Sequence, residues 1–523
     1  MDASDPRACE ANEARLGPPL MGRSTRPAAT TSPLDALDPS HSAALREELP
    51  GIEDAFEERG VSALLKSALF DGDDRRYACE RWERAQAVYV PGDHCLVRYR
   101  TEVCDRTGAV VMPALVVGRL SPDLACSRAY LESRLAPLAR AMRGRPEVAP
   151  FATPVAVLEP LCMTVSVFPI DGELPTLVGA TDPAAALEIL RDQLPDATAG
   201  RFTPTRCNVD LGHYGRQHRC VLRYTVHGTG PAGGEAAPVT VYGKIAADHR
   251  GALTAAVIRE LREHVLRGKA PPFAVPRSFG FIEPLELTLL EAIPGRPRIA
   301  GWLKELASSG AGGAAPALAG AVEAAARVAA GLHGSGISLG PSRLIDDELV
   351  ELGVSFAALQ RVSPGLAAEF GGWLDATCVC AAASDPGRVC LSHGDFTDSQ
   401  LIFSDQRRGL VDFDTVCRAE PALDLGQFLA YLRMGARKAG LAASADGREA
   451  TERLCTRFLD TYMIEGGCGP AARDALRARV RVYEMVSLLR LAFHSWQKFK
   501  TARLELVLGL IRERAPSLVG ETA

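Results

Sequence analysis

Two stretches of this chain repeat the same short segments in the same order, at a nearly constant offset of 122 to 125 residues. Such ordered matches predict a duplicated unit of three strands, a helix and two further strands. Only two copies are present, which favours a duplicated lobe over a solenoid, and chance similarity between Arg- and Val-rich strands is the alternative. The matched pairs include residues 95–99 with 220–224, 116–120 with 241–245, 150–152 with 272–274, and 159–161 with 283–285.

Composition narrows the class of protein. With 47% apolar and 24% charged residues, the chain has an ordinary globular balance, which excludes a mainly disordered or collagen-like chain. Its 523 residues suggest about three folding units. A net charge of −5 gives no general attraction to nucleic acid or to a membrane surface, so we expect neither as a partner.

The location expected from the sequence is cytoplasmic. No uninterrupted apolar stretch approaches the roughly 18 residues of a membrane-spanning helix, and the first residues lack the basic and apolar parts of a secretory signal. Fourteen cysteines occur without a Cys-x-x-Cys pair, which indicates buried free thiols. Protein partners and oligomeric state cannot be read from these features.

The changes in pattern along the chain divide it into four parts of α+β and helical character. Residues 1–45 are rich in Pro, Ala, Ser and Thr and are predicted to be a disordered tail. Residues 46–195 and 196–300 carry the two repeated units, and 301–523 is mainly helical, with one stretch of short strands and loops.

The densest cluster of chemical groups lies at 391–414. Two apolar strands flank polar loops there, and a hairpin between them would bring Asp395, Gln400 and Asp412 together. A carboxylate in such a loop can orient a hydroxyl and accept its proton. An amide oxygen and a second carboxylate can hold a hard divalent cation, which prefers oxygen ligands. An ordinary polar hairpin is the alternative.

This segment resembles a known enzyme family. His393-Gly394-Asp395, an amide five residues after the aspartate, and a strand followed by Asp412-Phe413-Asp414 are similar to the motifs of the aminoglycoside phosphotransferase family. The resemblance implies a protein-kinase-like two-lobe fold, with an antiparallel-sheet N-lobe and a mainly helical C-lobe, here preceded by an extra N-lobe-like α+β domain. It also implies an ATP-dependent phosphotransferase that uses Mg²⁺ and a small-molecule hydroxyl acceptor.

The resemblance assigns roles to individual residues. Asp395 would be the catalytic base, Gln400 and Asp412 would be magnesium ligands, and His393 would support the loop. Gln400 departs from the commoner Asn of the family, and its extra methylene puts the ligand distance in doubt. For Asp414 we prefer a loop cap to a second metal ligand.

Two further positions fit the same family. The segment 421–426 resembles the family's Pro-x-x-Asp-Leu run, and there we expect Asp424 to act at a helix start, where its carboxylate binds backbone N–H groups. His333 resembles the histidine of the family's Leu-His segment and is expected to be structural.

Lysine is scarce in this chain, with 7 of 59 basic residues, so each lysine invites an explanation. Lys244 ends a predicted third strand, where a kinase-like N-lobe needs a lysine for the α- and β-phosphates of ATP. Its acidic partner would be Glu260, with Glu263 as the alternate, both on one face of the following helix. The first copy has Arg119 in place of Lys244, which predicts a degenerate copy without the ion pair.

Two loops complete the predicted nucleotide site. Residues 211–217 could cover the phosphates with backbone amides, and they read equally well as a hairpin turn. Residues 289–295 resemble the family's hinge, where the backbone from Glu291 to Ile293 would meet the edge of adenine.

Two other classes of function were weighed. The runner-up is a catalytically weak or inactive kinase-like protein that binds a nucleotide or a partner, supported by Gln400 and by the degenerate first copy. A Ser/His hydrolase is disfavoured because no Gly-x-Ser-x-Gly segment occurs. The acceptor itself cannot be identified: Tyr483, Phe493 and Trp496 could line its pocket, although core packing is the better interpretation for each.

Overall fold

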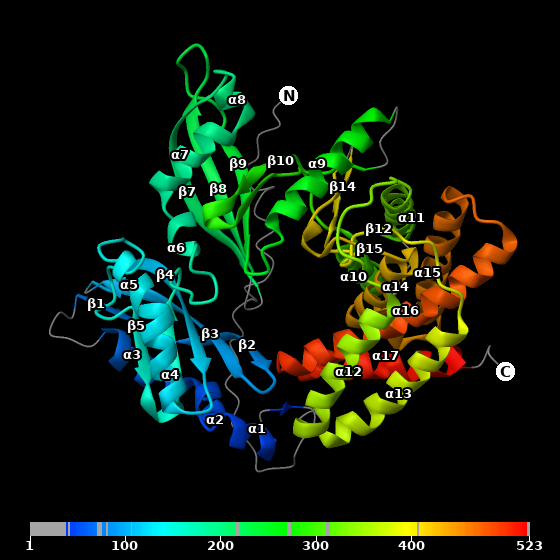
Figure 1. Cartoon of the computed structure of the whole chain (residues 1–523), viewed down its shortest axis with the longest axis horizontal. Helices are drawn as coiled ribbons and strands as arrows, with labels where there is room; N and C mark the ends of the chain where they lie inside the picture. Colours follow the sequence, from blue (N-terminus) through cyan, green and yellow to red (C-terminus); the bar gives the residue numbers. More distant parts are fainter. Residues whose placement is uncertain are drawn as a thin grey trace.

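The structure is a computed structural model that describes residues 38–519, apart from 40–41, 71–75, 80–81, 106, 216–218, 269–272, 310–313 and 405–406. Most of the predicted N-terminal tail and part of the loop at 211–217 lie outside these described residues. The described chain forms three parts, which are two α+β units and a helical lobe (Figure 1).

The first α+β unit is a six-stranded antiparallel sheet with short helices. Its strands follow the order β1-β3-β4-β6-β5, and β2 also pairs with β3. The strands are β1 (Tyr77–Cys79), β2 (Glu83–Val90), β3 (His94–Asp105), β4 (Val110–Leu120), β5 (Val155–Leu158) and β6 (Met163–Val167). The helices are α1 (Ala43–Glu48), α2 (Ile52–Phe56), α3 (Glu58–Phe70), α4 (Leu124–Tyr130) and α5 (Ala136–Ala141).

The second α+β unit follows three short connecting helices and has a five-stranded sheet of order β10-β11-β9-β8-β7. The connectors are α6 (Leu177–Ala180), α7 (Pro183–Gln193) and α8 (Pro195–Thr198). The unit itself comprises β7 (Thr203–Tyr214), β8 (Arg219–Thr229), β9 (Val239–Ala246), α9 (Gly251–Arg267), β10 (Ser278–Ile282) and β11 (Leu287–Glu291).

The two sheets share four equivalent strand pairings. In the first sheet, β4 pairs with β3 and β6, and Arg119 lies opposite Leu96. In the second sheet, β9 pairs in the same way with β8 and β11, and Lys244 lies opposite Val221. Arg119 and Lys244 therefore hold corresponding places in their sheets. Duplication of one ancestral unit stays a prediction, since a shared strand order does not by itself establish common origin.

Alternation explains why the second sheet has one buried face. Along β8, every second residue is buried, and the buried apolar side chains are Cys220, Leu222, Tyr224 and Val226. A strand places successive side chains on opposite faces, so this period of two puts the four on one side of the sheet. The neighbouring residues face the other way.

The C-lobe begins at α10 and is mainly helical, with two small two-stranded sheets. The α+β class, the antiparallel-sheet N-lobe and the helical C-lobe predicted from the sequence are thus confirmed, with another α+β unit before them. The helices are α10 (Ile299–Ser309), α11 (Ala314–His333), α12 (Ile345–Val362), α13 (Pro364–Ala383), α14 (Pro421–Lys438), α15 (Ala445–Glu465), α16 (Pro470–Gln497) and α17 (Thr501–Val519). The strands are β12 (Cys390–Ser392), β13 (Leu401–Phe403), β14 (Arg408–Leu410) and β15 (Cys417–Ala419).

Helix α11 is long and apolar enough, by length and composition, to cross a membrane, and it is the one such helix among the described residues. Half of its most apolar window is buried inside the structure, with Leu318, Val322 and Leu332 in the C-lobe core. A buried core helix meets the same criteria, and α11 packs as one against α10 and α15.

The packing of α14 against α16 positions the site, because α14 carries two of its polar side chains. Gly426 allows the close approach: a Cβ at this position would lie 2.5 Å from the backbone nitrogen of Glu484. Gly426 stands between Asp424 and Gln427, so the spacing of the two helices sets where these side chains end.

We predict that Gly426→Ala destabilises the protein by about 1–3 kcal/mol, because the added methyl group must push α14 away from α16. Chemical denaturation followed by circular dichroism measures the change. Gly320→Ala in α11 is the matched control: its Cβ would meet open space, so helix propensity should stabilise the protein by about 0.5–1 kcal/mol. Equal effects of both substitutions would contradict the packing argument.

Candidate active site

The loop after β12 presents the predicted catalytic aspartate. Gly394 has φ +75°, in the left-handed region, and a Cβ there would overlap the carbonyl oxygen of Thr415. Glycine therefore satisfies both the backbone angle and the lack of space. The tight turn at Gly394 places Asp395 at the loop surface, partly exposed, while His393 is fully buried.

Asp424 of α14 fixes this loop through hydrogen bonds to its backbone. Its buried carboxylate accepts hydrogen bonds from the backbone N–H of His393 at 2.7 Å and of Gly394 at 2.8 Å, and it contacts Nε2 of His333 at 3.1 Å. Burial alone would raise the pKa of Asp424, but the hydrogen bond from His333 and the other donors outweigh it and lower that pKa. Asp424 does bind backbone N–H groups as expected, but those of the catalytic loop.

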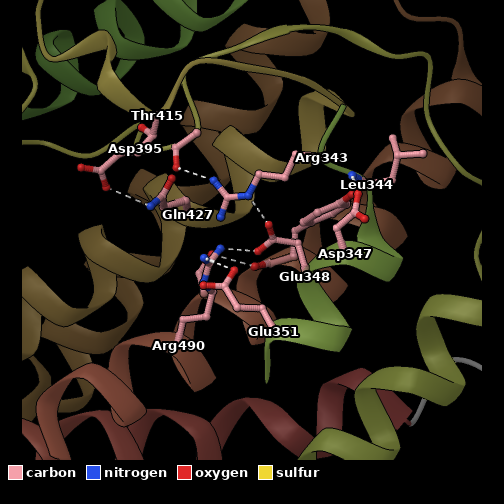
Figure 2. Close-up of polar contacts among 12 residues, drawn as sticks. Arg343, Leu344, Asp347, Glu348, Glu351, Asp395, Thr415, Gln427 and Arg490 are labelled. Carbon is pink, nitrogen blue, oxygen red and sulfur yellow. Dashed lines mark hydrogen bonds and ion pairs between the residues drawn. The ribbon is translucent and has the colours of Figure 1, made fainter. Parts of the chain in front are cut away.

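Asp395 is oriented by two amide side chains. Gln427 Nε2 donates to one carboxylate oxygen at 3.1 Å (Figure 2). Gln400 Nε2 donates to the other at 3.3 Å. Gln427 also accepts the backbone N–H of Phe396 at 3.0 Å. The sequence reasoning missed Gln427, although it lies three residues after Asp424 and therefore on the same face of α14.

An ion network supports the same loop from α12 and α16. Figure 2 shows Arg343 between the loop and Glu348: it donates to the carbonyl oxygen of Gly394 at 3.3 Å and pairs with the buried carboxylate of Glu348. Arg490 pairs with the other oxygen of Glu348 and with Glu351 at 2.7 Å. Arg343 and Glu348 are near neighbours in the sequence, but their contacts with Gly394 and Arg490 join distant segments, which no local motif could have indicated.

Lys244 reaches from β9 to the second polar loop. Its ammonium contacts the carboxylate of Asp412 and lies 3.3 Å from that of Asp414. Asp412 has φ 71°, so the backbone turns sharply at the residue that makes this contact. The structure thus brings the predicted phosphate-binding lysine to the predicted metal loop.

The charges in this cluster shift one another. Burial disfavours the charged form of Lys244, but Asp412 and Asp414 outweigh that effect and raise the pKa of the lysine. Burial likewise opposes ionisation of Asp412, yet Lys244 lowers the pKa of that carboxyl group. For Asp414, burial together with the negative charge of Asp412 raises the pKa. Lys244 is the counter-cation of both carboxylates.

The predicted partner of Lys244 is wrong in this structure. Glu260 and Glu263 are both exposed, and Glu263 pairs with Arg267 at 3.2 Å. Helix α9 buries Ala255, Ile258 and Leu261, and the two glutamates fall on its other face. Asp414, for which we preferred a loop cap, lies 3.3 Å from the ammonium of Lys244.

The two polar loops are tied to each other. The ring Nε2 of His393 donates to the carbonyl oxygen of Val411 at 3.0 Å, next to Asp412, so His393 supports the loop as predicted.

No group of three His, Cys, Asp or Glu side chains in the described part of the chain is arranged to hold a metal ion. The oxygens of Gln400 and Asp412 suit Mg²⁺ chemically, and their role as its ligands stays a prediction.

The predicted hinge joins the second unit to the C-lobe. Pairing of β11 with β9 ends at Glu291, whose carboxylate accepts the N–H of Arg277 at 2.8 Å and contacts Arg262 at 3.2 Å. The backbone that follows is free of this sheet pairing, and the side chain of Ile293 packs beside Gly409. Binding of adenine by Glu291 and Ile293 stays a prediction.

The aromatic residues considered for an acceptor pocket belong to the core. Tyr483 and Trp496 are fully buried, Phe493 is 7% exposed, and the hydroxyl of Tyr483 donates to Glu420. The preferred interpretation of these three residues, core packing, therefore holds in the structure.

Comparison with known proteins matches part of the chain to a family. Residues 244–459 match the phosphotransferase enzyme family, a segment that begins at Lys244 and includes Asp395, Gln400 and Asp412. The first α+β unit lies outside the match. Among curated proteins, no sequence match is found.

Solved structures give similarities of low identity. A glucosamine kinase in complex with glucosamine, ADP and inorganic phosphate is 14% identical, with a TM-score of 0.45 over 85% of this chain and 97% of its own. A choline/ethanolamine kinase family protein from Mesorhizobium loti is 16% identical, with a TM-score of 0.39 over 64% and 98%. A thermostable aminoglycoside phosphotransferase in a ternary complex with AMP-PNP and hygromycin B is 12% identical, with a TM-score of 0.40 over 65% and 99%. TM-scores below 0.5 do not support an inference about the site.

We predict that Asp424→Asn lowers the free energy of unfolding by about 1–3 kcal/mol at neutral pH, because the amide nitrogen faces backbone N–H donors. Since the folded-state pKa of Asp424 is lowered, its contribution is present above the unfolded value of about 3.9 and is lost as the pH falls below it. Urea denaturation of both proteins between pH 3 and 8 measures the difference. A difference that grows toward acid pH would contradict this assignment.

Proposed function

Residues 244–459 match the phosphotransferase enzyme family, and from this match we propose that the chain is an ATP-dependent kinase that phosphorylates a hydroxyl of a small molecule. The observation that carries the proposal is the convergence of Lys244, from the sheet of the second unit, on Asp412 and Asp414 of the C-lobe. The loop of Asp395 is tied to that same segment through His393 and Val411.

Lys244 would bind the phosphates of ATP. Its ammonium is a compact charge with three donors, and in the structure it contacts two carboxylates. Phosphate oxygens can replace these carboxylates as its partners, so that Lys244 stays paired in both states. Arginine would be a poor substitute, because its planar fork presents its N–H donors in fixed directions and needs acceptors placed to match.

Gln400 and Asp412 would hold Mg²⁺, which supplies charge neutralisation on the transferring phosphoryl group when bound. Both residues offer oxygen atoms, and the partly buried negative charge of Asp412 and Asp414 calls for a cation. If Lys244 moved toward the phosphates, these carboxylates would lose its positive charge and become available to Mg²⁺.

Asp395 would orient the acceptor and take its proton. Gln427 and Gln400 donate to its two oxygens and hold the plane of the carboxylate. The acceptor hydroxyl donates its proton to Asp395 as its oxygen forms a bond to the γ-phosphorus. The bond from that phosphorus to the bridging oxygen breaks, and ADP carries away the electron pair. The proposed setting for this reaction is the cytoplasm.

The second candidate is a kinase-like protein that binds nucleotide or a partner with little or no turnover. The observation that favours it is at Gln400, where the amide nitrogen points at Asp395 and the longer side chain replaces the family's commoner Asn. Thermal stabilisation by Mg·ATP without phosphorylation of any acceptor in a broad hydroxyl-compound panel would favour this candidate over the kinase.

We predict that Asp395→Asn lowers the phosphotransfer rate by about 10²–10⁴-fold, because the amide cannot take the proton, and leaves Mg·ATP binding intact. Turnover is measured as ADP release against a panel of sugars, amino alcohols and other hydroxyl compounds. Asp398→Asn, in the same loop, is the matched control and should retain activity. An Asp395→Asn enzyme with normal turnover would rule out the assigned role.

We predict that Lys244→Met abolishes Mg·ATP binding, and that it destabilises the folded chain by about 1–3 kcal/mol because two partly buried carboxylates lose their counter-cation. Lys244→Arg should keep most of the stability but raise the KM for ATP. Calorimetric titration and thermal unfolding measure the two effects, with the exposed Lys304→Met as control. Normal ATP affinity in Lys244→Met would refute the phosphate-binding role.

A further inference from the structure

The first α+β unit makes hydrogen bonds to the end of strand β7, which belongs to the second α+β unit. Arg98 of β3 is only 5% exposed, and its guanidinium donates to the backbone carbonyl oxygens of both Tyr214, at 2.8 Å, and Gly215. It also donates to Gln86 at 2.7 Å and lies 4.3 Å from the centre of the Tyr214 ring. One buried side chain thus fixes two consecutive peptide groups that are 116 and 117 residues away in sequence.

A second contact fixes the same point. The hydroxyl of Tyr214 donates to the carboxylate of Asp171, which follows the first sheet. Asp171 is itself held, because it accepts the backbone N–H groups of Glu173 at 2.8 Å and Leu174 at 3.2 Å. The ring of Phe168 packs against that of Tyr214 with centroids 5.4 Å apart. The end of β7 is therefore held through its backbone by Arg98 and through its side chain by Asp171.

The held segment belongs to the sheet that carries Lys244. His213 pairs with Val221 of β8, and Val221 pairs with Lys244 of β9, so the end of β7 lies two strands from the lysine. At the usual strand spacing this is about 10 Å. Desolvation lowers the pKa of His213, and the charges acting on it include those of Arg98, Asp412 and Lys244. The β7 end thus lies between the first unit and the nucleotide site.

The other side of the first unit is anchored on the C-lobe (Figure 1). Glu48 of α1 accepts the hydroxyl of Tyr89 at 2.8 Å and pairs with Arg361 of α12 at 3.2 Å. The ring of Tyr89 packs edge-on against Trp496 of α16, with centroids 5.7 Å apart. The unit therefore spans from the C-lobe helices to the end of β7.

We propose that the first α+β unit is a positioning module for the nucleotide site, with Arg98 as the positioning residue that holds β7 at Tyr214 and Gly215. The module takes its fixed reference from the C-lobe and sets where the β7–β8 strand pair stands relative to Lys244 and Asp412. Arginine suits the role, since its fork serves two carbonyl oxygens at once, and lysine offers no such planar pair of donors. The inference rests on the proposed function, in that its ligand is ATP.

The test uses the full chain, with Mg·ATP binding measured by isothermal titration calorimetry and backbone ordering by hydrogen–deuterium exchange. Arg98→Ala should weaken Mg·ATP binding by about tenfold, the value of one lost charge-assisted hydrogen bond, and Arg98→Lys should weaken it less. Exchange should rise in residues 207–215 and 219–222 and stay unchanged in α14 and α16. A general loss of stability would instead raise exchange throughout the chain.

Arg145→Ala is the matched control. Arg145 is also mostly buried in the first unit, and it donates to the backbone carbonyl oxygen of Val178 and to Glu147, away from β7. This variant should bind Mg·ATP as the unmodified chain does. If it weakens binding as much as Arg98→Ala, the effect belongs to the unit's stability in general, and the positioning role of Arg98 is refuted.

The outcomes separate this inference from the proposed function. Tight Mg·ATP binding by both the unmodified chain and Arg98→Ala would overturn the inference alone. No binding by the unmodified chain would overturn the proposed function, while local exchange at β7 would still decide whether Arg98 holds the strand. If Arg98→Ala does not fold, Tyr214→Phe removes only the hydroxyl bond to Asp171 and should weaken binding about threefold. Unchanged affinity and exchange in that variant would count against the proposed hold.

Discussion

The carboxylate of Asp424 is the interaction on which the site depends. A fully buried carboxylate is costly unless every oxygen has donors, and here the donors are the backbone N–H groups of His393 and Gly394 together with His333. These bonds run from a long core helix to a loop that has no regular structure of its own. The loop therefore takes its position from α14, and α14 takes its position from the close contact of Gly426 with α16. The precision with which Asp395 is positioned therefore depends on the rigidity of these contacts from α16 through α14 to the loop.

The second constraint is electrostatic. The charge of Asp412 raises the cost of ionising Asp414, and Lys244 of the second unit offsets it. An ion pair between lobes has two consequences. It stabilises the observed arrangement of Lys244 and the carboxylates, and it makes these carboxylates and any incoming phosphate compete for the same lysine. Glu260 of α9 is exposed, and Asp412 and Asp414 contact Lys244 in its place.

The sequence predicted much of the fold because strand alternation and helical periodicity are local signals. It predicted Asp395, Gln400, Asp412 and Lys244 as one site because a resemblance tied their spacing together, and the structure brings Lys244 to Asp412. It did not predict the partner of Lys244, since that depends on which face of α9 packs inward. Arg343, Glu348 and Arg490 were equally unreadable, because three distant helices and loops meet only in the folded chain. Gln427 was readable in principle, from its place one turn after Asp424.

The two α+β units show why one sheet position can have different fates. Arg119 and Lys244 occupy corresponding places, but the guanidinium of Arg119 has partners within its own unit: Asp93 at 3.0 Å, Ser121 at 3.0 Å and the ring of Tyr130. A guanidinium with several fixed partners is held in one direction and has little reason to exchange them for a ligand. Lys244 contacts two carboxylates through a compact ammonium that imposes less directional demand than a guanidinium, so a phosphate can replace them at little geometric cost. By this argument, the first unit acts on the site by holding strand β7 through Arg98 and Asp171. The second unit acts on it by making Lys244 available to the phosphates.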